Sequence, residues 1–124
     1  REKFEELPLD ADHAALIAAL GKPQACGYWH DTGHAQIKDR LGLLKHRDHL
    51  AQNAAHLIGF HLHDVSADGR DHQAIGSGQI DFKMVSSFWQ PEHTLVIELS
   101  PRLTSAEVLD SKRQVEALLA ARFG

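Results

Sequence analysis

The sequence predicts an α/β fold in which short parallel strands alternate with helices. Three short apolar runs, at about 25 to 31, 58 to 63 and 94 to 99, have the length and flanking turn residues of buried strands. Between them lie segments whose apolar residues recur at helical spacing. Because strands that alternate with helices form parallel units with right-handed crossovers, we expect a parallel sheet covered by helices.

The helices before the second strand are predicted from apolar spacing and from their end signals. Asp10 can cap a first helix, and Gly21 followed by Pro23 ends it. A second helical stretch is expected over about 39 to 57, with a break near 45 to 48. Three histidines on this stretch stand among charged residues, which favours a solvated helix face: His46, His49 and His56.

The helices of the second half have clearer caps. A polar, glycine-bearing segment at 64 to 78 is too long for a simple turn and is of the kind that carries function. Asp81 then caps a short helix that ends before Pro91. Thr104 and Glu107 form a capping-box pattern that opens the last helix.

The spacing between strand ends bears on the architecture. The ends at Asp31, His61 and Glu98 are about 30 and 37 residues apart, close to the roughly 31 residues per unit of an eight-stranded barrel. Three strands cannot close a barrel, so this is either a small open sheet or the last part of such a barrel. Because the chain begins at Arg1 without an initiator methionine, we expect an upstream part to be missing.

The composition excludes several classes of protein. With a net charge of -4 and a pI near 6.2, the chain has no general attraction for phosphate backbones, so nucleic acid is not a favoured partner. No run approaches the roughly 18 apolar residues of a membrane span, and the N-terminus lacks a signal-peptide pattern. We therefore expect a cytoplasmic protein with no membrane partner. The single cysteine, Cys26, is expected to be a small buried hydrophobe.

A metal-competent side chain ends each apolar run: Asp31, His61 and Glu98. The ends of parallel strands open to solvent at one edge of the sheet, where these three could hold a divalent cation. Each has a structural alternative, because an aspartate is often a helix cap and a histidine in an apolar run can be a core residue. Alternation puts His63 on the same face as His61, so His63 could be a ligand instead. We expect Glu98 to be costly to bury without a cation or a donor.

The residues around these strand ends resemble the closing segment of the xylose-isomerase-like TIM barrels. That superfamily includes sugar phosphate isomerases, ketose 3-epimerases and the zinc-dependent AP endonucleases. The resemblance implies that residues 1–124 form the C-terminal part of one TIM barrel domain, with strands six to eight of the (β/α)8 barrel. It rests on these motifs: Asp31-Thr32-Gly33-His34-Ala35, His61-Leu62-His63-Asp64, Asp71-His72, Gly76-Ser77-Gly78-Gln79-Ile80-Asp81 and Val96-Ile97-Glu98-Leu99.

The resemblance also implies a set of site residues. Asp31, His61 and Glu98 match three of the family's four metal ligands, and the fourth, a fifth-strand glutamate, would lie upstream of Arg1. His34 and His72 match histidines that contact substrate in the epimerases or bind further zinc in the endonucleases. Two departures are clear: Arg70 replaces the endonucleases' aspartate, and Ser77 replaces an acidic residue between two glycines.

The implied reaction is isomerisation or epimerisation of a small sugar or sugar phosphate through an enediolate, whose charge a cation stabilises. In the family Glu98 would both bind metal and move a proton, and this fragment alone should be inactive. The metal could be Mn²⁺, Mg²⁺, Co²⁺ or Zn²⁺. Arg102 could meet an anionic substrate, and the backbone of Gly76-Ser77-Gly78 could meet a phosphate.

Two other functions remain open. One is a metal-dependent phosphodiesterase resembling AP endonuclease, which Arg70 and the acidic balance disfavour. The other is a non-catalytic α/β binding module. In either case the exposed strand edges of an incomplete barrel predict self-association or pairing with the missing half.

Overall fold

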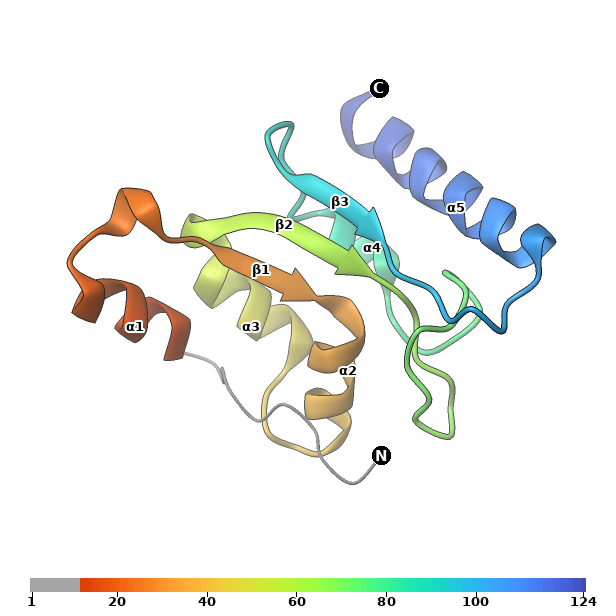
Figure 1. Ribbon diagram of the computed structural model, residues 1–124, viewed down its shortest axis with the longest axis horizontal. Coiled ribbons are helices and arrows are strands. Elements are labelled where there is room, and N and C mark those ends of the chain that lie inside the picture. Colours follow the sequence, from red (N-terminus) through yellow and green to blue (C-terminus); the bar gives the residue numbers. More distant parts are fainter. Residues whose placement is uncertain (1–11) are drawn as a thin grey trace.

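The computed structural model describes residues 12–124 and has the predicted α/β architecture (Figure 1). Three parallel strands alternate with helices, and the parts expected from the apolar runs are all present. In chain order the elements are α1 (Asp12–Leu20), the 3-10 turn η1 (Pro23–Ala25), β1 (Tyr28–Asp31), α2 (Thr32–Arg40), α3 (His46–Asn53), the 3-10 turn η2 (Ala54–His56), β2 (Leu57–Leu62), α4 (Phe82–Ser86), β3 (Thr94–Ile97) and α5 (Ser105–Phe123).

The sheet has the strand order β1-β2-β3, so each strand pairs with its neighbour along the chain. The register places Asp31 beside His61 and Leu62 beside Ile97. The Glu98 N–H extends the pairing by donating to the Leu62 carbonyl at 3.0 Å. The carboxyl ends of all three strands are therefore level with one another.

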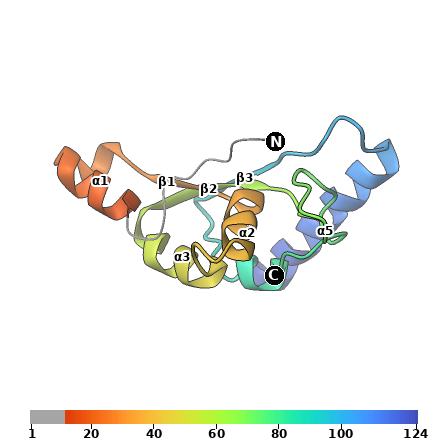
Figure 2. The same cartoon turned by 90° about the horizontal axis from the view of Figure 1, so that it is seen from below.

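The helices that follow the strands lie on one face of the sheet (Figure 2). Strand alternation sends the apolar side chains of β2 toward these helices, and the resulting core is closed by α4 and α5. Its fully buried members are Leu50, Phe60, Leu62, Val65, Val85 and Trp89. Trp89 is the largest of these side chains and packs in the core. The other face of the sheet carries Trp29, His61 and the exposed Val96.

The second helical stretch differs from the expectation. Instead of one broken helix over 39 to 57, α2 begins directly after β1 and α3 begins at His46. The pair Thr32-Gly33 has low helix propensity, which hid this start in the sequence. The helix forms here because the Asp31 side chain caps it by accepting the His34 N–H at 2.9 Å.

The other predicted helix ends are confirmed where the structure describes them. Asp81 caps α4 by accepting the Met84 N–H at 3.1 Å. Thr104 and Glu107 form the expected capping box at the start of α5. Gly21 follows α1 in the left-handed conformation, with a φ of 64°. The cap expected at Asp10 lies outside the described residues.

Candidate metal centre

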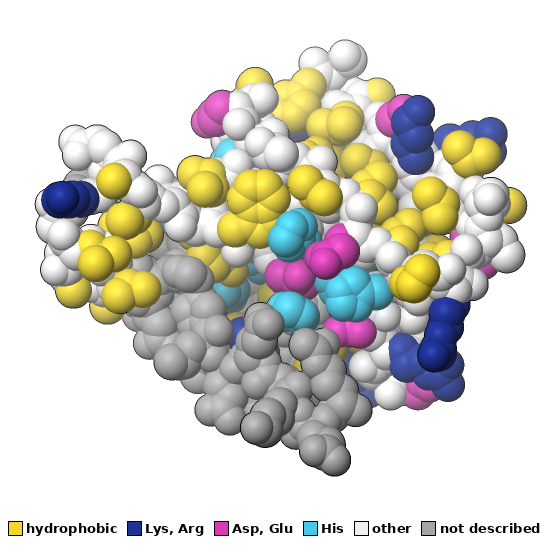
Figure 3. All heavy atoms as spheres, in the orientation of Figure 1, with side chains coloured by type: hydrophobic (Ala, Val, Ile, Leu, Met, Phe, Trp, Pro, Cys, Tyr) yellow, Lys and Arg dark blue, Asp and Glu magenta, His cyan; other side chains and the backbone are white. Residues whose placement is uncertain are grey.

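The carboxyl ends of the three strands bring together the side chains of Asp31, His61 and Glu98. His61 Nδ1 lies 3.9 Å from Asp31 Oδ2 and 3.5 Å from Glu98 Oε2. One ligand atom from each residue lies within 4.8 Å of the other two, so the group could hold a metal ion. Figure 3 shows histidine and acidic side chains gathered over this end of the sheet. The three predicted ligands therefore converge as the strand ends indicated.

The two carboxylate oxygens of Asp31 have different tasks. Oδ1 accepts hydrogen bonds from the His34 N–H at 2.9 Å and from His63 Nε2 at 2.7 Å. Oδ2 faces His61 and leaves room for a cation. Burial by itself would raise the pKa of Asp31, but the hydrogen bonds from His63 Nε2 and from the His34 N–H together hold it well below its usual range. Asp31 is therefore ionised, as a metal ligand must be.

His34 and His72 lie beside this centre. His34 Nδ1 lies 3.7 Å from Asp31 Oδ2, and His72 Nε2 lies 3.8 Å from Glu98 Oε1. Both rings are partly exposed. A second set of side chains that could hold an ion shares Glu98 and consists of His63, His72 and Glu98. We name the whole group the metal cluster: Asp31, His34, His61, His63, His72 and Glu98.

Two site residues expected from the sequence, Glu98 and Arg102, follow β3. The Glu98 side chain is 45% exposed, so it is not buried and the cost of burial expected for it does not arise. Its strand is at the edge of the sheet and nothing described covers that face. Arg102 is exposed in the turn before α5, and within the described chain only its backbone N–H is bonded, to Ser100 Oγ at 3.2 Å.

Another group of histidines lies on the opposite, helix-covered face of the sheet. His30 is completely buried here, and His46 and His49 are only 3% exposed, so the solvated face predicted for these last two was wrong. Tyr28 Oη lies 2.8 Å from both His30 Nδ1 and His49 Nε2, and His30 Nε2 lies 2.9 Å from His46 Nε2. We call Tyr28, His30, His46 and His49 the buried histidine chain.

One set of tautomers satisfies this chain. Gln36 Oε1 lies 3.1 Å from His46 Nδ1, which therefore carries the proton. His30 Nε2 then donates to His46 Nε2, and the Tyr28 hydroxyl donates to His30 Nδ1. Burial, the main cause, lowers the pKa of His46 to about 4 and that of His30 well below its usual range. The His30 and His46 rings are neutral at pH 7, and their nitrogens are used by Tyr28, Gln36 and each other.

The glycine loop after β2 does not offer its backbone to a phosphate. The buried carboxylate of Asp64 accepts the N–H groups of Gly76, Gly78 and Ile80 at 2.9 to 3.1 Å. The Ser77 N–H donates to the Ala74 carbonyl. The expectation of free N–H groups at Gly76-Ser77-Gly78 was therefore wrong, because a buried aspartate in the same loop already uses the N–H groups of both glycines.

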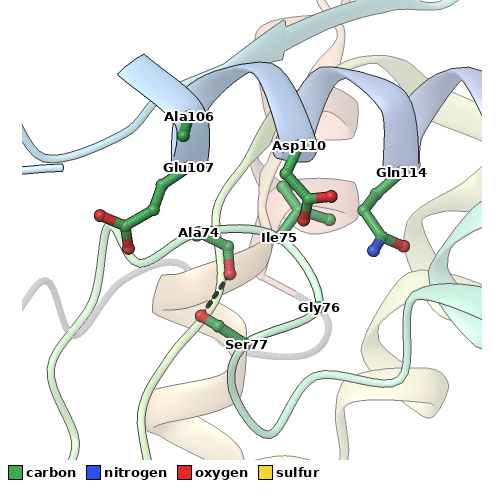
Figure 4. Close-up of a pocket in the computed structure, with 8 residues that line it drawn as sticks. All are labelled: Ala74, Ile75, Gly76, Ser77, Ala106, Glu107, Asp110 and Gln114. Carbon is green, nitrogen blue, oxygen red and sulfur yellow. Dashed lines mark hydrogen bonds between the residues drawn. The ribbon is translucent and has the colours of Figure 1, made fainter. Parts of the chain in front are cut away.

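A pocket of about 370 Å³ lies between this loop and the first turns of α5, away from the metal cluster (Figure 4). Its two acidic residues are Glu107 and Asp110. Glu107 is occupied by the capping box with Thr104. Asp110 and Gln114 lie on the α5 side of the pocket, and among the described residues its lining includes no histidine, cysteine or basic residue.

No helix of the described residues is long and apolar enough to cross a lipid bilayer. The sequence singled out five of the cluster's six residues and named His63 only as an alternative ligand. Alternation from His61 was the signal that placed His63 on this face.

Compared with models of protein families and with curated proteins, the chain has no match.

Proposed function

We propose that this chain is part of a divalent-metal-dependent isomerase or epimerase that acts on a small sugar or sugar phosphate. The observation that carries the proposal is the convergence of Asp31, His61 and Glu98 at the carboxyl ends of three consecutive parallel strands. In parallel α/β folds, ligands and catalytic groups collect at this end of the sheet. The resemblance to the xylose-isomerase-like barrels supplies the reaction class.

The residues present fit a divalent cation. Asp31 is ionised and uses Oδ1 for its hydrogen bonds to His34 and His63, while Oδ2 faces His61, and His61 and Glu98 add one nitrogen and one oxygen. Two carboxylates with one imidazole suit Mn²⁺, Mg²⁺, Co²⁺ or Zn²⁺. Such a cation would polarise a carbonyl and stabilise the negative charge that develops when a neighbouring proton is removed.

The other residues of the cluster have roles that follow from their exposure. Glu98 is half exposed and lies between His61 and His72, so its carboxylate can reach a substrate and move a proton. His34 and His72 are partly exposed on either side and can hydrogen-bond sugar hydroxyls. Arg102, which is exposed and follows Glu98 by four residues, is our candidate cation for the phosphate of a phosphorylated substrate.

The open sheet favours pairing with further strands. Within the described residues β1 and β3 each have one neighbour, and the face that carries His61 has no helix over it. We propose that residues 1–124 form the C-terminal units of a TIM barrel. Upstream strands would complete it and add a further glutamate ligand, and without them the chain would self-associate.

The test begins with metal binding by the full-length protein. Isothermal titration with Zn²⁺ and Mn²⁺ should show one strong site, and Glu98→Gln, which keeps the size but removes the charge, should weaken it. Conversion of a panel of ketoses and ketose phosphates, followed by NMR, should then require both the metal and Glu98. A protein that binds no metal would instead support the non-catalytic module.

A phosphodiesterase resembling AP endonuclease is the second candidate, because the set of His63, His72 and Glu98 could hold an additional ion. Against it, Arg70 points to solvent and pairs with Asp68 at 3.1 Å, so this position adds no acidic ligand. Two or more bound ions, together with cleavage of a duplex containing an abasic site, would favour this candidate over the isomerase.

A further inference from the structure

We propose that His63 is a positioning residue that holds Asp31 in its ligating orientation, and that His63 is not itself a metal ligand. This inference rests on the proposed metal site. It concerns a side chain that is completely buried, with 0% exposure, between the site and the loop that follows β2.

The hydrogen bonds of His63 fix its tautomer. The backbone N–H of His72 points at His63 Nδ1 at 2.8 Å, and a backbone amide can only donate. Nδ1 must therefore present its lone pair, and the proton of the neutral ring lies on Nε2. That proton points at Asp31 Oδ1, 2.7 Å away. With one nitrogen accepting and the other donating, His63 has no lone pair left for a cation.

The surrounding chain locks the ring in this place. The Thr32 hydroxyl donates to the His63 carbonyl at 2.7 Å and accepts the His63 N–H at 3.1 Å. Gly33 leaves room for the imidazole, because a Cβ at this position would overlap the His63 ring. Within the Asp31-Thr32-Gly33 sequence, the first residue thus faces the metal site while the next two position His63.

The opposite side of the ring is fixed as tightly. His72 has a φ of 57°, a left-handed conformation that is uncommon for a non-glycine residue. Its N–H is held by His63 Nδ1 and its carbonyl accepts the Ser100 N–H at 2.9 Å. The His63 and His72 rings stack with centroids 4.2 Å apart and planes 2° apart. His63 therefore links the orientation of Asp31 to the backbone that carries His72.

This assignment decides between the two sets of residues that could hold an ion. Ligation by His63 would require its Nε2 to lose both its proton and the hydrogen bond to Asp31. The set of Asp31, His61 and Glu98 needs no such rearrangement. Orientation of a ligand by a buried partner of this kind typically accounts for about 10- to 100-fold in metal affinity.

Two substitutions distinguish the role of His63 Nε2 as a donor from that of Nδ1 as an acceptor. His63→Gln places an amide nitrogen near the position of Nε2, so it can keep the donor to Asp31 while losing the acceptor for His72. His63→Asn places an amide oxygen near Nδ1, so it keeps the acceptor and loses the donor. We expect the asparagine variant of the full-length protein to bind Zn²⁺ about 10- to 100-fold more weakly, and the glutamine variant to stay within about 3-fold of wild type.

Thermal unfolding of the metal-free variants is the matched control, because each loses one buried hydrogen bond and both should be destabilised to a similar extent. Equal losses of Zn²⁺ affinity in the two variants would overturn the positioning role. If both variants lose as much Zn²⁺ affinity as His61→Gln does, His63 is a ligand, and the inference is overturned as well.

A direct measurement remains if either variant fails to fold. Long-range ¹H–¹⁵N NMR of the wild-type protein should show His63 protonated at Nε2 and unprotonated at Nδ1, both without metal and with Zn²⁺. A proton on Nδ1, or a metal-bound Nε2, would overturn the inference. If no Zn²⁺ binds, the proposed function fails but the metal-free spectrum still tests His63; if Zn²⁺ binds through His63, the metal site stands and the positioning role fails.

Discussion

Strand β1 supplies side chains to two histidine groups on opposite faces of one sheet, and the two groups differ in almost every physical respect. The metal cluster contains two carboxylates and is partly open to solvent. The buried histidine chain contains no carboxylate and is covered by α2 and α3. In the first, Asp31 and Glu98 present charge to the solvent side. In the second, His30 and His46 are neutral and their ring nitrogens bond Tyr28, Gln36 and each other.

The comparison teaches that a histidine's role is set by its partners rather than by its burial or by its neighbours in the sequence. His61 keeps an available nitrogen beside two carboxylate oxygens, and is suited to a cation. His46 has one nitrogen against Gln36 and the other against His30, so it serves the core. His63 shares features of both groups. It is buried like the histidines of the buried histidine chain, but it bonds Asp31, a proposed ligand in the metal cluster.

The largest effect on Zn²⁺ affinity is expected when the same substitution, histidine to glutamine, is made in each of the two groups. His61→Gln should lower the affinity for Zn²⁺ by more than the roughly 100-fold that outer residues reach, because a direct ligand is lost. His46→Gln should leave that affinity unchanged while lowering the midpoint of thermal unfolding, since it disturbs only the buried histidine chain. Titration calorimetry and thermal unfolding on both variants check this. Loss of Zn²⁺ binding in His46→Gln would remove the distinction between the groups.

The sequence was a good guide to the first group and a poor one to the second. An apolar run that ends in a polar side chain identifies both the strand and the end of the sheet, so Asp31, His61 and Glu98 could be placed without coordinates. His46 and His49 lie among Lys45, Arg47 and Asp48, a local pattern typical of an exposed helix face.

What the local pattern cannot show is a partner distant in the sequence. Tyr28, which bonds His49, lies 21 residues away on a strand, and the contact exists only after α3 has packed under the sheet. The same limit hid the task of His63, since its two hydrogen-bonding partners belong to two other motifs. Residue type and spacing thus predicted where groups meet, while hydrogen bonding decided what each one does.

The next effect is a pH dependence that arises from the buried histidine chain. Burial lowers the pKa of His46 to about 4, against an ordinary value of about 6.5. As the pH falls below about 6.5, the unfolded chain takes up a proton that the folded chain does not, so stability decreases until about pH 4. At a limiting slope of about 1.4 kcal/mol per pH unit, His46 alone should lower the free energy of unfolding by about 2 kcal/mol between pH 6.5 and 5.

Urea unfolding at these two pH values, with a chelator present to remove metal, measures this change. His46→Gln should show a smaller decrease, because its side chain does not titrate, and the difference between the two proteins isolates this histidine from other ionisable groups. An equal decrease in wild type and His46→Gln would show that His46 is accessible to protons in the folded protein.

A somewhat smaller effect is expected at the centre of the chain. Tyr28→Phe removes the hydroxyl that lies 2.8 Å from both His30 Nδ1 and His49 Nε2, leaving buried ring nitrogens with one partner fewer. The cost should be about 1 to 2 kcal/mol in the free energy of unfolding, measured with urea at pH 7. Zn²⁺ affinity should remain that of wild type. A weaker affinity for Zn²⁺ would mean that β1 transmits changes from one face to the other.

The smallest effect is expected from Thr32→Val, which probes the contact between the metal cluster and the start of α2. The substitution keeps the shape of the fully buried side chain but removes the hydroxyl that bonds the His63 backbone at 2.7 and 3.1 Å. Loss of this contact should cost about 1 kcal/mol in the free energy of unfolding. Zn²⁺ affinity should fall only a few-fold, because the His63 ring keeps its bonds to Asp31 and His72. If the affinity instead falls as far as in His63→Asn, the position of the ring depends on the backbone clamp of Thr32, and the hydrogen bond to Asp31 is a consequence of that clamp.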